Sequence, residues 1–190
     1  HLSRANYLLS KCKSLGTLPF SIAARHGFTA EVLLRTAVRR GALSVARLTE
    51  FKKTIQTVSG NMLRAYSAVF TGEISQDEFF KVYGHLRPGT YEITSLRYDE
   101  RSDLFLEAIP SSKCNSSGNF FLEPSEREAL NALLAECGLD NVSADGLMAY
   151  AKKAIAAREE VKFTFTRSLS DALSHLVTWG HFYGLSRDDL

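Results

Sequence analysis

The sequence predicts an all-α fold: a multi-helix bundle with one long C-terminal helix and an irregular polar loop region over about 84–121. Apolar residues recur three and four positions apart over most of the chain, which is the period of a helix with one buried face. Helix start signals are frequent, and Ser75–Glu78 and Ser125–Glu128 both have the Ser-x-x-Glu pattern of a capping box. With 190 residues, of which 45% are hydrophobic and 23% charged, the chain can bury a core as a single helical domain, 1–190.

Two helices are predicted at the N-terminal end. The first covers Arg4–Leu15 and ends at Gly16, because glycine is a common helix terminator. Pro19 fits the first turn of a second helix, where its missing N–H costs nothing, and this helix runs to Arg40. Gly41 can then adopt the left-handed conformation that closes it.

The next predicted helix is long. Ser44 is its expected N-cap, and apolar residues continue at helical spacing from Val45 to Val69. A fourth helix opens with the capping box Ser75–Glu78 and ends at Gly84.

The helical period is lost from Glu92 to about Phe121. Within this region, 110–119 is small and polar and predicts a flexible surface excursion, and Phe120–Leu122 is a candidate short strand. Pro124 and the second capping box then open a helix that runs to about Cys137.

A single long helix is predicted for the C-terminal region, over 143–183, because its apolar stripe keeps one phase throughout. The alternative is a break near Thr166. Two β-branched residues, Thr164 and Thr166, and the helix-start pattern Ser168–Asp171 favour that break.

Charge and cysteine usage narrow the class of protein. A net charge of +2, without a dense run of lysine and arginine, argues against a nucleic-acid partner. The three cysteines, Cys12, Cys114 and Cys137, form no metal-ligand pattern and are odd in number, which is typical of a reduced, cytoplasmic protein. No apolar run is long enough to cross a membrane. Because an amphipathic pattern begins close to His1, we expect a piece excised from a longer multidomain protein.

The loop between the fourth and fifth predicted helices carries the candidate ligand-binding residues. Glycine and proline fix its backbone, and its cations and tyrosines can hold an anion or a hydroxylated ligand. The candidates there are His85, Arg87, Tyr91 and Arg97. For His85 two interpretations stay open: it contacts a ligand, or it ties the loop to a neighbouring helix by hydrogen bonds.

Arg158 is a candidate because it occupies the apolar stripe of the last helix, where an unpaired charge is costly. Either it joins an internal ion-pair network with Glu92, Asp99 or Glu100, or it converges with Arg97 on a bound phosphate or carboxylate.

The sequence contains no pattern for independent catalysis. No histidine pair has the spacing of a helical metal site, and no nucleophile-and-base pattern or glycine-rich phosphate loop is present. A stand-alone enzyme is therefore the least favoured interpretation.

Several stretches, taken together, resemble the middle region of phosphoenolpyruvate synthase-like proteins, relatives of pyruvate phosphate dikinase and of rifampin phosphotransferase. The stretches are Gly16–His26, Arg39–Ser44, Tyr83–Ile93, Ser95–Glu100, Ala157–Phe163 and Phe165–Ser170. Within them, Tyr83, Gly84, His85 and Pro88 match the loop motif, and Arg158 and Glu159 match a helix pattern of the group.

The resemblance implies the acceptor-binding helical domain of an ATP-dependent phosphotransferase. ATP and Mg²⁺ would belong to the full-length protein, and the partners would be its nucleotide-binding and phosphohistidine domains and a small-molecule acceptor. The antibiotic enzymes have His-Arg-Gly-Pro where this chain has His85-Leu86-Arg87-Pro88, so the resemblance does not name the acceptor. The alternative function is a structural spacer that links those two domains.

Overall fold

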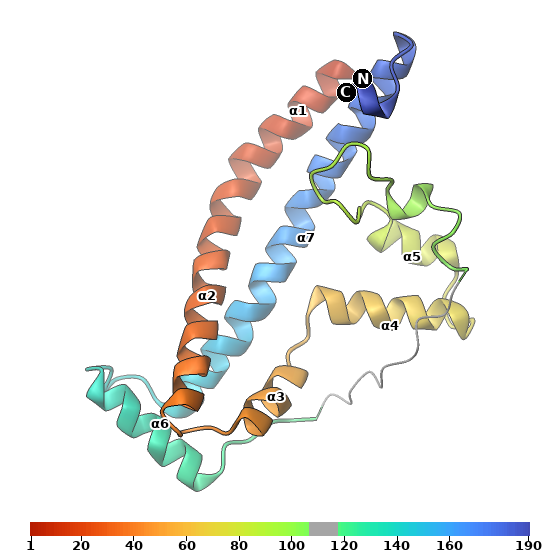
Figure 1. Ribbon diagram of the computed structural model, residues 1–190. Coiled ribbons are helices and arrows are strands. Elements are labelled where there is room, and N and C mark those ends of the chain that lie inside the picture. The colour runs from red at the N-terminus through yellow and green to blue at the C-terminus, as the bar shows by residue number, and fades with distance from the viewer. Residues whose placement is uncertain (107–117) are drawn as a thin grey trace. The chain divides into compact units, whose positions relative to one another are not determined.

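The computed structural model describes residues 1–106 and 118–190 (Figure 1). The fold is all-α, as predicted, and the described residues contain no strand. The α-helices are α1 (Leu2–Cys12), α2 (Leu18–Arg39), α3 (Val45–Lys53), α4 (Val58–Phe70), α5 (Gln76–Tyr83), α6 (Pro124–Glu136) and α7 (Ala144–Phe182). A π-helical segment, Lys13–Thr17, joins α1 to α2, and short 3₁₀ helices cover Tyr98–Glu100 and Arg187–Asp189.

The chain forms two compact units, which are described separately. The first contains His1–Phe20, Ser59–Ser112 and Val161–Leu190, and the second contains Ser21–Val58 and Lys113–Glu160. The predicted single domain stays a prediction. Most of the predicted excursion, 110–119, lies outside the described residues.

The prediction that Gly16 ends the first helix is wrong. The backbone continues from α1 through the π-helical segment into α2, and the wider π turn accommodates Pro19, which cannot donate a helical hydrogen bond. Gly16 has a packing role instead, because a Cβ atom at this position would lie only 2.7 Å from Cβ of Phe165 on α7. The end of α2 is confirmed, with Gly41 in the left-handed region at φ 78°.

Gly16→Ala is expected to destabilise the first unit by about 1–2 kcal/mol, since the clash with Phe165 outweighs the better helix propensity of alanine. Urea unfolding followed by the fluorescence of Trp179, the single tryptophan, measures the loss. Gly146→Ala is the control, followed by far-UV circular dichroism. Gly146 is exposed in the first turn of α7, and a Cβ there meets only the Ser143 hydroxyl.

The single long helix predicted over 45–69 is wrong, because two helices, α3 and α4, cover this region. Ser44 caps α3 as expected, accepting a hydrogen bond from the Arg47 N–H at 3.1 Å. The break follows Lys53, where the N–H groups of Thr54 and Ile55 bond carbonyls three residues back, Phe51 at 2.9 Å and Lys52 at 3.2 Å, in place of the α-helical partners four residues back. The apolar period continues across the break, which is why periodicity alone misses it.

Two later helix starts test the capping predictions. The capping box of α5 is confirmed: the Ser75 hydroxyl accepts from the Glu78 N–H at 3.2 Å, and the Glu78 carboxylate accepts from the Ser75 N–H at 2.7 Å. The second box is misplaced by two residues, since α6 begins at Pro124 and Glu126 accepts from the Glu123 N–H at 2.9 Å.

The predicted continuous C-terminal helix is confirmed, and the alternative break near Thr166 is wrong. The Thr166 hydroxyl donates to the carbonyls of Lys162 and Phe163, within the preceding turn, so the threonine satisfies its hydroxyl without leaving the helix.

The candidate strand at Phe120–Leu122 is also wrong. No neighbouring strand lies in the described part of the chain, and the side chains of Phe120 and Leu122 anchor the segment to the core of the second unit. Phe120 packs edge-on against Phe51, and the guanidinium of Arg47 lies 4.4 Å from the centre of the Phe120 ring. Leu122 is buried in the same core.

Each unit has its own core. In the second, α2, α3, α6 and the first half of α7 bury aliphatic side chains such as Leu34, Leu130 and Met148. In the first, α1 packs on α7 through Ala5, Leu8 and Ala172. A separate aromatic cluster joins α4 and α5 to the segment that follows the loop, and its members are Tyr66, Phe70, Phe79, Phe80 and Phe105.

Candidate functional site

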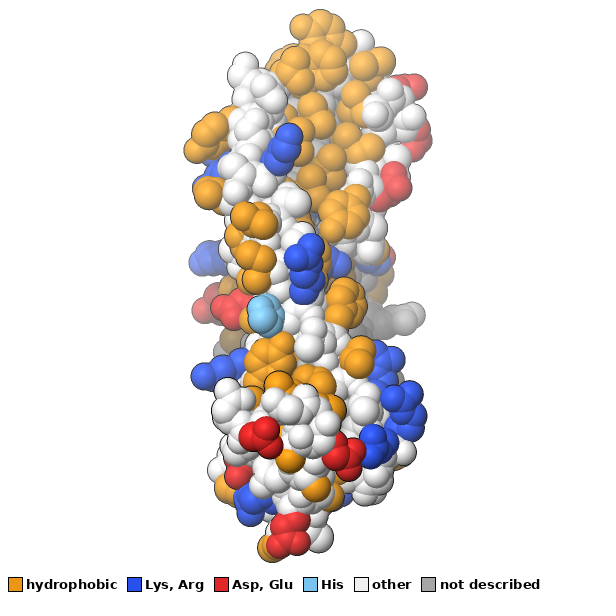
Figure 2. Space-filling view, turned by 90° about the vertical axis from the view of Figure 1, so that its left-hand side faces the viewer, with side chains coloured by type: hydrophobic (Ala, Val, Ile, Leu, Met, Phe, Trp, Pro, Cys, Tyr) orange, Lys and Arg blue, Asp and Glu red, His pale blue; other side chains and the backbone are white. Residues whose placement is uncertain are grey.

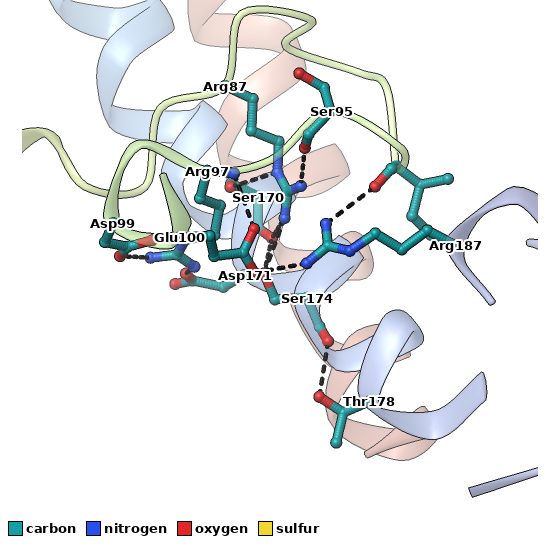
Figure 3. Close-up of polar contacts among 11 residues, drawn as sticks. Arg87, Ser95, Arg97, Asp99, Glu100, Ser170, Asp171, Ser174, Thr178 and Arg187 are labelled. Atoms are coloured by element: carbon teal, nitrogen blue, oxygen red, sulfur yellow. Dashed lines mark hydrogen bonds and ion pairs between the residues drawn. The ribbon is translucent and has the colours of Figure 1, made fainter. Parts of the chain in front are cut away.

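The predicted polar loop follows α5 and packs on α7 through its cations (Figure 3). Its backbone is held at both ends by hydrogen bonds, from the Tyr98 N–H to the Leu86 carbonyl at 2.8 Å and from the Asp99 N–H to the Gly84 carbonyl at 3.2 Å. The loop therefore closes on itself before the 3₁₀ helix Tyr98–Glu100 begins.

Arg87 is the buried anchor of this loop, with only 6% of its surface exposed. It donates from Nε to the Ser170 hydroxyl at 3.0 Å and from Nη2 to the Ser174 hydroxyl at 2.9 Å, and Nη1 donates to the Ser95 carbonyl (Figure 3). All of these acceptors are neutral. Because no bonded carboxylate compensates for its burial, the pKa of Arg87 is lowered.

Arg97 is the centre of an ion-pair cluster. It donates from Nε and Nη2 to both carboxylate oxygens of Asp99, at 2.9 and 2.8 Å, and from Nη1 to Asp171 on α7 at 2.8 Å. Burial alone would lower the pKa of Arg97, but the two carboxylates outweigh it and raise the pKa. The guanidinium is thus engaged by the protein itself.

Arg187, which is not among the residues predicted from the sequence, joins this cluster from the C-terminal 3₁₀ helix. Its Nη2 donates to Glu100 at 2.7 Å and its Nη1 to the Ile93 carbonyl at 3.3 Å. Burial alone would raise the pKa of Glu100, but hydrogen bonds from the Arg97 N–H and from Arg187 lower it. Nothing in the spacing of Arg187 signals this role, because it depends on where the chain places its last turn.

His85 is fully buried, with 1% of its surface exposed, and its ring centre lies 4.8 Å from that of Phe163. Neither ring nitrogen has a partner at hydrogen-bonding geometry within the described residues. Burial, followed by the positive charge of Arg167, lowers the pKa of His85 to about 4, so the ring is neutral near pH 7. His85 therefore contacts α7 by packing against Phe163, and not by the hydrogen bonds through which the sequence prediction tied the loop to a neighbouring helix. Its contact with a ligand stays a prediction.

The remaining predicted residues are Tyr91 and Arg158. Tyr91 is 64% exposed. Arg158 belongs to the second unit, where its guanidinium lies 5.6 Å from the centre of the Phe28 ring. A Cβ atom at Gly27 would lie 3.0 Å from Cδ of Arg158, so the aliphatic stem explains a charged residue on an apolar stripe.

Two alternatives are predicted for Arg158: ion pairs with acids of the loop, or a shared anion with Arg97. Of the acids expected to pair with it, Asp99 and Glu100 instead bond Arg97 and Arg187. The expected convergence of Arg158 with Arg97 on one anion stays a prediction, because these residues belong to different units.

A cavity of about 540 Å³ opens in the first unit, beside α4 and α5. Its apolar surface comes from α4, α5 and the segment after the loop, and its polar rim comes from the 3₁₀ helix Tyr98–Glu100 and the residues that follow it. The lining residues are Met62, Leu63, Tyr66, Phe79, Tyr98, Arg101, Asp103, Leu104 and Leu106. No pattern in the sequence predicts this cavity, since its apolar residues look like ordinary core positions.

The rim of this cavity is ordered. Arg101 donates to both carboxylate oxygens of Asp103, at 3.1 and 2.7 Å, and the Tyr66 hydroxyl donates to the Leu104 carbonyl at 2.5 Å. The rings of Tyr66 and Phe105 stack with their centres 5.0 Å apart. Such a site can bind a flat apolar molecule and orient a polar or anionic substituent at Arg101.

Other site classes find no support in the part of the chain that the structure describes. It contains no group of three or more histidine, cysteine or carboxylate side chains arranged to hold a metal ion. None of its helices combines the length and the hydropathy needed to cross a bilayer. No family model, curated protein or solved structure matches this chain.

Proposed function

We propose that this chain is a non-catalytic helical domain that binds a small organic acceptor in the cavity beside α4 and α5. In keeping with the resemblance to phosphoenolpyruvate synthase-like proteins, it would present that acceptor within an ATP-dependent phosphotransferase. ATP, Mg²⁺ and the phosphohistidine would come from other domains, and this chain alone would transfer no phosphate.

The observation that carries the proposal is the combination of an apolar cavity with a charged rim. The cavity volume of about 540 Å³ lies in the range of ligand sites for small organic molecules. Arg101 pairs with Asp103 on the rim, and its side chain keeps 30% of its surface exposed, so donor capacity remains for a ligand.

The polar loop has a supporting role in this proposal. Arg87 and Arg97 fix the loop on α7, and the loop delivers Tyr98 and Arg101 directly to the rim. Arg87 and Arg97 are thus positioning residues in this proposal, whereas the sequence predicts that they contact the ligand.

The proposal predicts that anilinonaphthalene sulfonate, a flat aromatic anion, binds with one-to-one stoichiometry. Arg101→Gln is expected to weaken binding about tenfold by removing the charge on the rim. Leu63→Trp is expected to abolish it by filling the cavity. Fluorescence titration measures both effects, with circular dichroism to confirm that each variant is folded.

Arg127→Gln is the matched control, since Arg127 also makes a two-oxygen pair with an aspartate, Asp145, but in the second unit. It should bind the probe as the parent chain does. Equal binding by the Arg101→Gln and Leu63→Trp variants and the parent chain would refute the cavity as the site.

A second candidate function, a spacer between moving domains, is favoured by a different observation: the loop cations Arg87 and Arg97 are bonded internally. A spacer needs a rigid loop and no ligand. It would be preferred if the folded chain bound no probe at the cavity.

A further inference from the structure

One side of α2 in the second unit carries a regular row of exposed residues. The buried side of this helix consists of Gly27, Ala30, Leu34 and Ala37. The opposite side carries exposed cations and hydrophobic residues, which we call the outer row: Arg25, Phe28, Val32, Arg35 and Arg39. Phe28 is 60% and Val32 55% exposed, and Figure 2, which faces the left-hand side of Figure 1, shows exposed hydrophobic and basic side chains with acidic ones among them.

The spacing of the outer row indicates the kind of partner. Its members follow one another at intervals of three, four, three and four residues, a mean period of about 3.5. This is the repeat of a coiled-coil seam, in which each side chain fits between residues of a facing helix. The two hydrophobic residues are neighbours within the row, and arginines lie on both sides of them. A second helix therefore fits this surface.

The charges on α2 indicate the chemistry of that helix. Three of the five members of the outer row are arginines, and the guanidinium of Arg158 lies 5.6 Å from the ring of Phe28. The one acidic residue of α2, Glu31, is outside the row and bonded to Lys52 at 2.8 Å. Guanidinium groups covered by a docked helix require carboxylates on that helix. A second copy of this face would bring arginines against arginines and is disfavoured.

We propose that the outer row of α2 docks an amphipathic helix that carries glutamate or aspartate beside its apolar residues. This is an interaction surface in addition to the proposed ligand site. It involves only the second unit, so it stands or falls independently of the cavity in the first.

The test uses a labelled designed peptide of about three heptads, long enough to cover the row, with leucine at positions a and d and glutamate at e and g. Fluorescence anisotropy should show one-to-one binding that weakens with salt. The same peptide with lysine at e and g should not bind. Arg25→Glu and Val32→Glu should each weaken binding at least about tenfold.

Lys153→Glu, which reverses an exposed charge on α7 outside the row, is the control and should bind normally. Circular dichroism confirms the fold of each variant. The proposal is overturned by equal binding of the two peptides, by an Arg25→Glu variant that binds like the parent, or by no binding at all.

Two further experiments test whether a membrane or a second copy of the chain binds the outer row instead. Binding to vesicles of about one-third phosphatidylserine in phosphatidylcholine, lost in Arg25→Glu without any peptide binding, would assign the face to a membrane instead. Dimerisation in sedimentation experiments, abolished by Val32→Glu, would assign it to a second copy.

Discussion

Arg87→Ala is expected to lower the free energy of unfolding of the first unit by about 3 kcal/mol, a large effect for a single substitution. The guanidinium is buried and donates to Ser95, Ser170 and Ser174, so its removal leaves several acceptors without donors. It also opens a cavity where the side chain lay.

Arg87→Lys should recover part of this loss, because an ammonium group supplies charge but cannot match the planar fork of a guanidinium. Urea unfolding followed by Trp179 fluorescence measures both variants, since Trp179 lies in the same unit. Arg4→Ala is the control: Arg4 is exposed on α1 in that unit, and its loss should cost less than about 0.5 kcal/mol. An Arg87→Ala variant as stable as the control would contradict the anchoring role of this loop residue.

Local signals in the sequence predict much of the fold. The capping box at Ser75–Glu78, the N-cap Ser44 and the left-handed Gly41 are each confirmed, because such signals act between residues three or four apart. The wrong predictions concern positions whose conformation depends on contacts with residues far away in the sequence. Gly16 is needed for close packing against Phe165, and no local pattern distinguishes that use of glycine from a helix end.

The sequence predicts which loop carries the polar residues of the candidate site, but it predicts neither their bonding partners nor the cavity. The loop named from the sequence does contain polar residues that pack on α7, and two of its cations make those contacts. Their partners are missed, because Ser170, Asp171 and Ser174 look like a helix-start signal or ordinary helix surface. The cavity is not predicted, because a lining residue such as Leu63 has the same side chain and spacing as a core residue. The two differ only in whether an open space or another side chain lies against them.

His85 makes the stability of the first unit depend on pH from about pH 6.5 downwards, at pH values where most carboxylates are still ionised. Burial in the first place, and then the positive charge of Arg167, lowers its pKa from 6.5 to about 4, and Arg97 acts in the same direction. Asp171 and the Phe163 carbonyl oppose this shift only in part. The neutral imidazole is therefore the form that the folded protein accepts.

The sign of the effect follows from proton linkage. Between about pH 6.5 and pH 4 the unfolded chain binds a proton at His85 and the folded chain does not, so acidification favours unfolding. Stability is complete above the unfolded pKa and falls as the pH drops towards the folded one. The difference between the two pKa values corresponds to a loss of about 3 kcal/mol across this interval.

His85→Leu isolates this contribution, because leucine fills the apolar site and leaves no titrating group there. From about pH 7 to pH 5 the parent chain should lose about 2 kcal/mol more than the variant, when both are measured by urea unfolding at each pH. Protonation of Glu100 does not yet lower the stability in this interval. Because the pKa of Glu100 is lowered, its carboxylate stays ionised in the folded protein until the solution is more acidic. Parallel pH profiles for the two proteins would show that the imidazole is not held neutral by burial, and the loop would then have to open at His85 far more readily than its packing against Phe163 implies.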